Sequence, residues 1–364
     1  MLRGAIRGLL RACPPELKTK VQAGLQRDDD DVAPGKPACD WTDRAAREAL
    51  VDELVRDAYR AHFALQGERL DPRTAEAAVL LATVTGQDIE ETSDGRFRIF
   101  EGTAPGRVIS SVDPQARHGH KTAAHGVDGD KAHVAIDPSS EVICAAEVSA
   151  ATAGDAAVAP TLLGDLTPDQ QGGQAARAVV YGDRAYGTGT HLAWLDQQQL
   201  TPMVKAQLPT AAGGRFTKDQ FRIDLAAGTV TCPAKVTASI VAAHHGGGRA
   251  RFGAACSVCP LRNACTSSVH GRVVAIHPHQ AELAAARARQ RDPAWVADYP
   301  ATRPKVERKL AHLLRRRHGG RRAWVRGLVR VTQDFKLLAA AVNLGRLAAL
   351  GLRSTASGWQ LQSA

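Results

Sequence analysis

The chain has 364 residues, of which 44% are hydrophobic, and this is enough to bury a core in two or three domains. Its formal net charge of +10 favours a polyanionic partner, and no apolar run approaches the about 18 residues of a membrane-spanning helix. Seven cysteines are an odd number, and four of them lie between positions 232 and 265, which favours reduced thiols over a secreted disulfide framework. We therefore expect a cytoplasmic protein without a membrane partner.

Residues 1–100 are predicted to form a helical N-terminal segment, because apolar residues recur there at helical spacing. Nothing in this segment indicates catalysis. The expected helices are a pair within residues 1–30 divided at Pro14-Pro15, a helix over 43–66 with Thr42 as its N-cap, and a helix from Pro72 to about Thr85.

The pattern changes at Arg107, where VISSVD alternates like a half-buried strand and ends in Asp113-Pro114. A carboxylate thus leaves the end of a predicted strand. The following RHGHKTAAHG lacks the first glycine of a phosphate-binding loop. We interpret it as a solvated basic loop, with metal binding by its three histidines as the alternative; these are His118, His120 and His125.

Residues 101–205 alternate between strand and helix patterns, which predicts an α/β fold with a mixed sheet flanked by helices. The expected elements are a hairpin of strands over 131–137 and 141–149, a helix over 155–163, a strand over 177–183, a helix over 189–199 and a strand over 201–205.

The segment VVYGDRAYG places Asp183 directly after the strand over 177–183. Open α/β sheets bind ligands at the carboxyl ends of their strands, so this carboxylate is a candidate functional group. An aspartate in this position can instead cap the next helix. The segment alone leaves both readings open.

Residues 206–295 interrupt the α/β pattern and hold Cys256 and Cys259, with Cys265 after them and Cys232 before. Two thiolates two residues apart can bind one tetrahedral Zn²⁺, and a second pair can close the site. The alternatives are a closed structural zinc site formed by the four cysteines, and free buried thiols.

Residues 296–352 contain a predicted helix that begins at Pro304 and has Glu307 in its first turn, where a carboxylate is also favoured by the helix dipole. Residues 291–364 contain 15 Lys and Arg but only 4 Asp and Glu, so the excess positive charge of the chain is concentrated in this part. The run RRRHGGRRAWVRG has Trp324 among arginines, which suits phosphate contacts with some stacking, although a solvated basic helix has the same composition. Residues 353–364 are predicted to be a tail.

Two strand-end aspartates and a helical glutamate beyond a cysteine-containing insertion resemble the ribonuclease H-like core of the DDE transposases of bacterial insertion sequences. The similarity covers about residues 1–352 and is carried by VDPQARHGHK, GDKAHVAID, VVYGDRAYG, CSVCPLRNAC, YPATRPKVERKLAHLLRR and AAAVNLGRL. It implies that Asp113, Asp183 and Glu307 are the three catalytic acids and hold Mg²⁺ or Mn²⁺. Tyr299 and Arg303 match the tyrosine-arginine-glutamate motif of the group.

The resemblance implies a nucleoid-associated enzyme that cleaves and transfers strands of double-stranded DNA, at the ends of the insertion sequence and at its target, and it allows a homodimer. The family often has Gly-Tyr-Lys where this chain has Gly129-Asp130-Lys131, and its members usually begin with a further helical DNA-binding domain, which we expect to be missing here. The candidate DNA-contacting residues are Lys131, His133, Tyr299, Arg303, Arg315, Arg316, Arg317, Arg321 and Arg322.

Three alternatives stay open from the sequence. Asp128 or Asp137 could be the first acid in place of Asp113, which we prefer because it follows the first predicted strand. An inactive or truncated remnant could act only as a DNA-binding protein. A zinc-dependent hydrolase is disfavoured, because the four proposed zinc ligands are all cysteines and no HExxH pair occurs.

Overall fold

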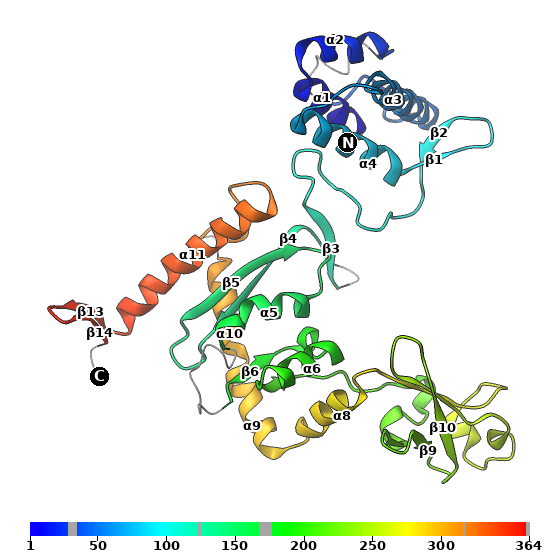
Figure 1. Cartoon of the computed structure of the whole chain (residues 1–364), viewed down its shortest axis with the longest axis vertical. Coiled ribbons are helices and arrows are strands. Elements are labelled where there is room, and N and C mark those ends of the chain that lie inside the picture. Colours follow the sequence, from blue (N-terminus) through cyan, green and yellow to red (C-terminus); the bar gives the residue numbers. More distant parts are fainter. Residues whose placement is uncertain (28–34, 123–124, 167–176, 316, 362–364) are drawn as a thin grey trace. The chain divides into compact units, whose positions relative to one another are not determined.

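The computed structural model describes residues 1–27, 35–122, 125–166, 177–315 and 317–361 as a mixed α/β protein (Figure 1). The chain divides into two compact units. One comprises residues 1–132, 148–153 and 323–334, and the other comprises residues 133–147, 154–322 and 335–364. The predicted boundaries at residues 100, 205, 295 and 352 stay a prediction. Within the described parts of the chain, none of the helices combines the length and the apolar character that a membrane span requires.

Helices dominate the beginning of the first unit, as the sequence predicted. Their apolar faces form one core, in which Ile6, Leu9, Val21 and Leu81 are completely buried. Burying such side chains contributes about 1.5–3 kcal/mol each relative to leaving them exposed. The helices are α1 (Leu2–Ala12), α2 (Pro15–Gly24), α3 (Arg44–Ala64) and α4 (Pro72–Gln87), followed by the short hairpin β1 (Ile89–Glu91) and β2 (Phe97–Ile99).

The N-cap of α3 is Asp43, and the prediction of Thr42 was wrong by one residue. The Asp43 carboxylate accepts hydrogen bonds from the backbone N–H groups of Ala45 and Ala46. Thr42 instead donates its hydroxyl to Asp40. An aspartate at the N-cap satisfies two of the orphan N–H groups at the helix start, which a threonine one residue earlier cannot reach.

The predicted strand over 107–113 does not form. Only Val108 bridges to Arg117, and the Ser110 hydroxyl accepts hydrogen bonds from the N–H groups of Val112 and Asp113. A serine that bonds the backbone two and three residues ahead competes with a strand ladder, and this turns the chain before Asp113.

Residues 123–124 of the segment predicted to be a basic loop lie outside the described residues, and the part before them is a strand instead. It forms β3 (Arg117–Thr122), which pairs antiparallel with β4 (His125–Ile136) from Arg117 opposite Gly129. Gly119 makes this strand possible, because a Cβ there would lie 2.4 Å from the carbonyl oxygen of Ala151. The hairpin of β4 with β5 (Ile143–Ala150) confirms the predicted pair, with β4 longer than expected.

After β5, the α/β part of the second unit consists of short helical turns followed by a strand, a helix and a strand. The helix expected over 155–163 is split into a 3₁₀ turn at Asp155–Val158 and α5 (Ala159–Leu162), with a further turn at Gly164–Leu166. The predicted strand–helix–strand that follows is confirmed as β6 (Val179–Gly182), α6 (Gly189–Gln197) and β7 (Thr201–Val204). β6 and β7 are parallel, and Leu195 and Leu200 are buried in the core that α6 shares with α5.

Hydrogen bonding divides the expected mixed sheet into two sheets among the described residues, β3-β4-β5 and β6-β7. The α/β class is therefore established, and the ribonuclease H-like arrangement of its strands stays a prediction. The insertion has its own antiparallel sheet in the order β12-β11-β10-β9-β8 (Figure 1). Its strands are β8 (Arg222–Asp224), β9 (Thr229–Thr231), β10 (Thr237–Ala242), β11 (Gly248–Arg251) and β12 (Val273–Ile276), with the short helix α7 (Arg262–Cys265) between the last two.

Helices complete the chain after the insertion. They are α8 (Gln280–Arg289), α9 (Pro293–Thr302), α10 (Pro304–Leu313) and α11 (Leu328–Ala349). Residues 352–361, which include most of the predicted tail, form a hairpin of β13 (Leu352–Thr355) and β14 (Gly358–Leu361), and residues 362–364 of that tail lie outside the described residues.

Candidate functional site

Asp183 lies at the carboxyl end of β6, where the strand stops and a 3₁₀ turn over Arg184–Tyr186 begins. One carboxylate oxygen accepts a hydrogen bond of 2.9 Å from the N–H of Ala185, so the capping role is real. The side chain is still 48% exposed. Capping and a functional role are therefore both open to this carboxylate, because only one of its oxygens is engaged by the turn.

Two glycines permit this strand end. A Cβ on Gly182 would lie 2.9 Å from Val204 Cγ1 and 3.0 Å from Tyr186 Cβ, and a Cβ on Gly187 would lie 2.0 Å from the carbonyl oxygen of Lys205. The close packing of β6, the turn and β7 thus explains the glycines of VVYGDRAYG. Side chains at these two positions would push the turn, and Asp183 with it, away from β7.

Arg303 connects Asp183 with Glu307. Its Nη2 lies 3.4 Å from Asp183 Oδ2, and its Nη1 lies 3.4 Å from Glu307 Oε1. The Arg303 side chain is 13% exposed, and its Nε and Nη1 are buried without a hydrogen-bond partner. One guanidinium therefore brings together two carboxylates that are 124 positions apart in sequence.

Tyr299 fixes α9 against the end of β6. Its hydroxyl donates a hydrogen bond of 3.0 Å to the carbonyl oxygen of Gly182, and its ring stacks on Trp295 at 4.5 Å between centroids. Burial raises the pKa of Tyr299, so the hydroxyl stays protonated and can donate. The last two residues of β6 and the residue after them thus contact α9 and its C-cap: Tyr181 donates to Asp298, Gly182 accepts from Tyr299 and Asp183 pairs with Arg303.

The four cysteines of the insertion line one cavity of about 20 Å³. Cys256 and Cys265 are buried, and Cys256 Sγ accepts a hydrogen bond from the N–H of Arg272 at 3.4 Å. Burial raises the pKa of the Cys265 thiol, and nearby Arg272 opposes this shift. The other two cysteines that line the cavity are Cys232 and Cys259.

The candidate metal ligands are not gathered into a complete metal site. Among the residues that the structure describes, no three His, Cys, Asp or Glu side chains are grouped closely enough to hold a metal ion. The donor types nevertheless suit two different ions. Asp183 and Glu307 offer the oxygen ligands that Mg²⁺ and Mn²⁺ prefer, and the cysteine cavity offers thiol ligands for Zn²⁺ with no carboxylate in its lining.

A family model described as a transposase DDE domain matches residues 231–348. This stretch of the chain is similar to the DDE domain of transposases. The match covers about a third of the chain and supports a transposase function. No curated protein and no solved structure matches the chain.

The DDE transposase match includes Tyr299, Arg303 and Glu307 together with the four cysteines, whereas Asp113 and Asp183 precede it. Asp183 is connected to the matched segment by its ion pair with Arg303. Asp113 belongs to the first unit, so its place beside the other two acids stays a prediction.

The alternatives to Asp113 have local partners of their own. The Asp137 carboxylate accepts hydrogen bonds from the backbone and hydroxyl groups of the β4–β5 turn, chiefly from Ser140, and these bonds lower its pKa. Asp128 lies 2.5 Å from His118 Nδ1. Asp130, which replaces the tyrosine common in DDE transposases, is partly buried. Its pKa is raised mainly by this burial and to a smaller extent by the negative charge of Asp113.

The candidate DNA-contacting residues differ in accessibility. His133 is buried, with only 6% exposed, so its side chain cannot reach DNA in this conformation. Lys131 donates to the carbonyl oxygen of Ala153. Arg316 lies outside the described residues. The exposed residues of the predicted set are Arg315, Arg317, Arg321 and Arg322, and Trp324 is 85% exposed.

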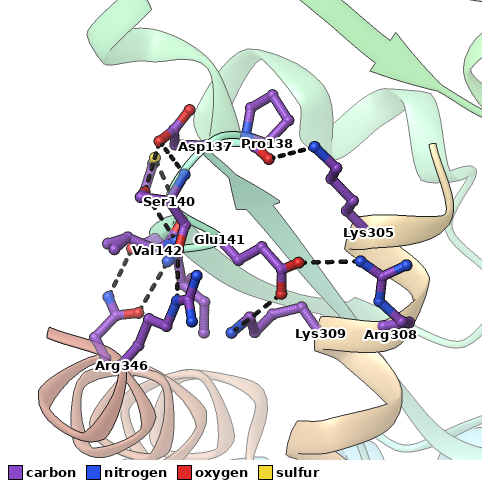
Figure 2. A network of polar contacts seen from close by, with 12 residues as sticks. Asp137, Pro138, Ser140, Glu141, Val142, Lys305, Arg308, Lys309 and Arg346 are labelled. Carbon is purple, nitrogen blue, oxygen red and sulfur yellow. Dashed lines mark hydrogen bonds and ion pairs between the residues drawn. The ribbon is translucent and has the colours of Figure 1, made fainter. Parts of the chain in front are cut away.

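A polar clamp on the β4–β5 turn was not predicted from the sequence (Figure 2). On α10, Lys305 donates to the carbonyl oxygen of Pro138, and Arg308 pairs with Glu141 at 3.0 Å. On α11, Arg346 donates to the carbonyl oxygen of Ser140. The side-chain amide of Asn343 donates a hydrogen bond to the carbonyl oxygen of Ile143 and accepts one from its N–H, so it bonds this residue as a neighbouring strand would.

This clamp ties the turn to the helix that carries Glu307. Glu141 faces Arg308 and also lies 4.0 Å from Lys309, while its backbone has a positive φ of 57°. The sequence did not reveal this clamp, because AAAVNLGRL and KVERKLAHLL have the pattern of ordinary amphipathic helices. In that pattern Asn343 and Lys305 look like any solvent-facing polar residue. The clamp fixes α10 independently of the Arg303 ion pairs.

Proposed function

We propose that this protein is a transposase that cleaves and joins strands of double-stranded DNA, with Asp113, Asp183 and Glu307 as its acidic residues. The observation that carries the proposal is the Arg303 guanidinium, which pairs with both Asp183 and Glu307. Glu307 and Arg303 lie within the segment that matches DDE transposases. Both carboxylates are partly exposed, and ion pairs between partly exposed groups contribute little to stability. The arginine that holds them together therefore indicates that the two carboxylates have a function other than stability.

The bound Mg²⁺ or Mn²⁺ would lower the pKa of water and stabilise the leaving oxygen of the cleaved strand. Asp183 and Glu307 would hold it, with Asp113 as the third acid. In this proposal the turn at Ala185 fixes one oxygen of Asp183, and the clamped α10 fixes the backbone of Glu307. Arg303 keeps the two carboxylates adjacent before DNA binds.

The exposed side chains of Arg315, Arg317, Arg321 and Arg322 would contact phosphates of the DNA without reading its sequence. We further propose that the four cysteines hold a closed structural Zn²⁺ in the insertion, since they line one small cavity whose lining has no carboxylate. A homodimer that brings two DNA ends together is part of the same proposal.

The test is a cleavage assay on duplex DNA that carries the ends of the insertion sequence, with Mg²⁺ or Mn²⁺ and with a chelator. We expect nicks with 3′-hydroxyl ends in the presence of metal, followed by their transfer to a target duplex. A protein that binds this DNA but produces no nick with either ion would favour the DNA-binding remnant and contradict the proposal.

A further inference from the structure

A second basic site lies beside the acid pair, in a part of the chain to which no function has been assigned above. It is a cavity of about 400 Å³ between the segment that follows β7, the turn over Lys218–Gln220, and helices α8 and α9. Its charged lining residues are Lys205, Asp219, Arg287 and Arg291, and Gln290 and Trp295 complete its wall.

The cavity is positive apart from one carboxylate. Arg287 is 7% exposed, and its Nε lies 3.4 Å from Asp219 Oδ1, while Arg291 Nη2 lies 3.4 Å from Asp219 Oδ2. Lys205 adds a third cation, with its Nζ 5.3 Å from the centroid of the Tyr299 ring. Three cations and one aspartate therefore line the cavity, so its lining carries excess positive charge beside the buried Arg287 side chain.

Asp219 occupies this site in the manner of a loosely bound anion. Strong charge-assisted bonds between arginine and a carboxylate measure about 2.7–2.9 Å, and both ion pairs here are longer. The Asp219 side chain is 28% exposed, so it can leave without unfolding the helices. A backbone phosphodiester carries one negative charge, as a carboxylate does, and its two unesterified oxygens can accept hydrogen bonds from the same two guanidinium groups.

The cavity is also connected to the acid pair. Trp295 in its wall stacks on Tyr299, and the Tyr299 hydroxyl binds the carbonyl oxygen of Gly182, the residue before Asp183. A DNA strand cleaved at Asp183 and Glu307 would therefore pass close to this cavity.

We propose that the cavity binds a phosphate group of the DNA backbone, and that Asp219 is an internal anion that occupies the site until DNA displaces it. This inference rests on the proposed function, which supplies DNA as the ligand. It makes Arg287, Arg291 and Lys205 phosphate-binding residues, and it makes Asp219 a residue that weakens DNA binding.

The experiment measures the affinity for a duplex of unrelated sequence by fluorescence anisotropy over a range of salt concentrations. Asp219→Asn should tighten binding roughly fivefold, the effect of removing one partly exposed competing charge. The matched control is Asp196→Asn, which changes the net charge equally at an exposed position of α6 and should leave the affinity nearly unchanged.

A second pair of variants keeps the test independent of any effect of Asp219 on folding. Arg291→Gln should weaken binding and lower the slope of log K against log salt by about 1, whereas Arg289→Gln, at an exposed position of α8 that does not line the cavity, should not. Each variant is first compared with the parent by thermal unfolding.

The outcomes separate this inference from the proposed function. If no variant and no parent protein binds DNA, both fail. If the parent binds DNA but Asp219→Asn behaves like Asp196→Asn and Arg291→Gln like Arg289→Gln, only the phosphate site is wrong. Saturable binding of inorganic phosphate by the parent, with DNA affinity unchanged in all four variants, would assign the cavity to a free anion and also overturn the inference.

Discussion

The hydroxyl of Tyr299 donates a hydrogen bond of 3.0 Å to the carbonyl oxygen of Gly182, and this bond joins α9 to the residue before Asp183. Tyr299 is 5% exposed, so the bond is shielded from water. Its neighbours extend the same junction, because Tyr181 donates to Asp298 and Arg303 pairs with Asp183. The junction positions an acid from the α/β part against the helices of the DDE transposase match.

Tyr299→Phe removes this donor and leaves the Gly182 carbonyl oxygen buried without its partner. We expect the free energy of unfolding to fall by about 1–2 kcal/mol, measured by urea denaturation. Tyr59→Phe is the control, because Tyr59 is 53% exposed. Equal denaturation midpoints for the two variants would show that the bond does not stabilise the junction.

Gly187→Ala tests the close approach of the turn to β7. The new Cβ would lie 2.0 Å from the carbonyl oxygen of Lys205, so the turn must shift, and we expect a loss of at least about 2 kcal/mol. Gly154→Ala has no atom within 4 Å of its Cβ and an ordinary φ of −70°, and it should change stability by less than about 1 kcal/mol. Similar unfolding temperatures for both variants would contradict the packing described here.

The clamp on the β4–β5 turn should make stability depend on pH. The hydrogen bond from Arg308 holds the pKa of Glu141 below its ordinary value of 4.5. A carboxyl group with a lowered pKa in the folded state stabilises the protein fully above its unfolded value, and this contribution is lost as the pH falls through the folded value. We therefore expect the parent to lose more stability than Glu141→Gln when the pH is lowered from above 4.5 to below it.

Thermal unfolding across that range is the measurement for Glu141. Asp196→Asn, an exposed carboxylate distant in sequence from the clamp, should follow the parent at every pH. Parallel curves for the parent and Glu141→Gln would mean that the pairs with Arg308 and Lys309 do not stabilise the folded state.

Local patterns predicted the helices and the strand–helix–strand around Asp183, because these depend on periodicity and on residues such as Pro15, Pro72 and Gly182. They failed at 107–122, where the Ser110 hydroxyl diverts the chain and the histidine-rich segment pairs with β4. That pairing depends on a partner strand and on Gly119, which the composition of the segment does not reveal.

The candidate site was predictable only in part for the same reason. Asp183, Arg303 and Glu307 were selected from the resemblance, and the structure adds the ion pairs that join them. The roles of Asn343, Lys305 and Asp219 depend on contacts between distant segments, and polar residues on helices and loops look alike in sequence. His133 was selected as a DNA contact although it is buried, because its alternating neighbours did not show which face of β4 is covered.

The cysteine cavity predicts that purified protein contains about one equivalent of zinc. Cys259→Ser should release most of it and lower the unfolding temperature, because a structural zinc site stabilises the fold that it closes. Cys39→Ser is the control, since Cys39 lies outside the insertion. Parent protein without zinc, in which all seven thiols react with a thiol reagent after unfolding, would favour free thiols.

The central claim is that Asp113, Asp183 and Glu307 act together on DNA. The direct measurement is the rate of metal-dependent nicking of end-sequence DNA by Asp113→Asn, Asp183→Asn and Glu307→Gln, with Asp196→Asn as the control and DNA affinity measured in parallel. Each of the three acid variants should lose nicking by on the order of 100-fold or more, with DNA affinity unchanged or slightly increased, and the control should match the parent. Nicking at the parent rate by Asp183→Asn or Glu307→Gln would contradict the account.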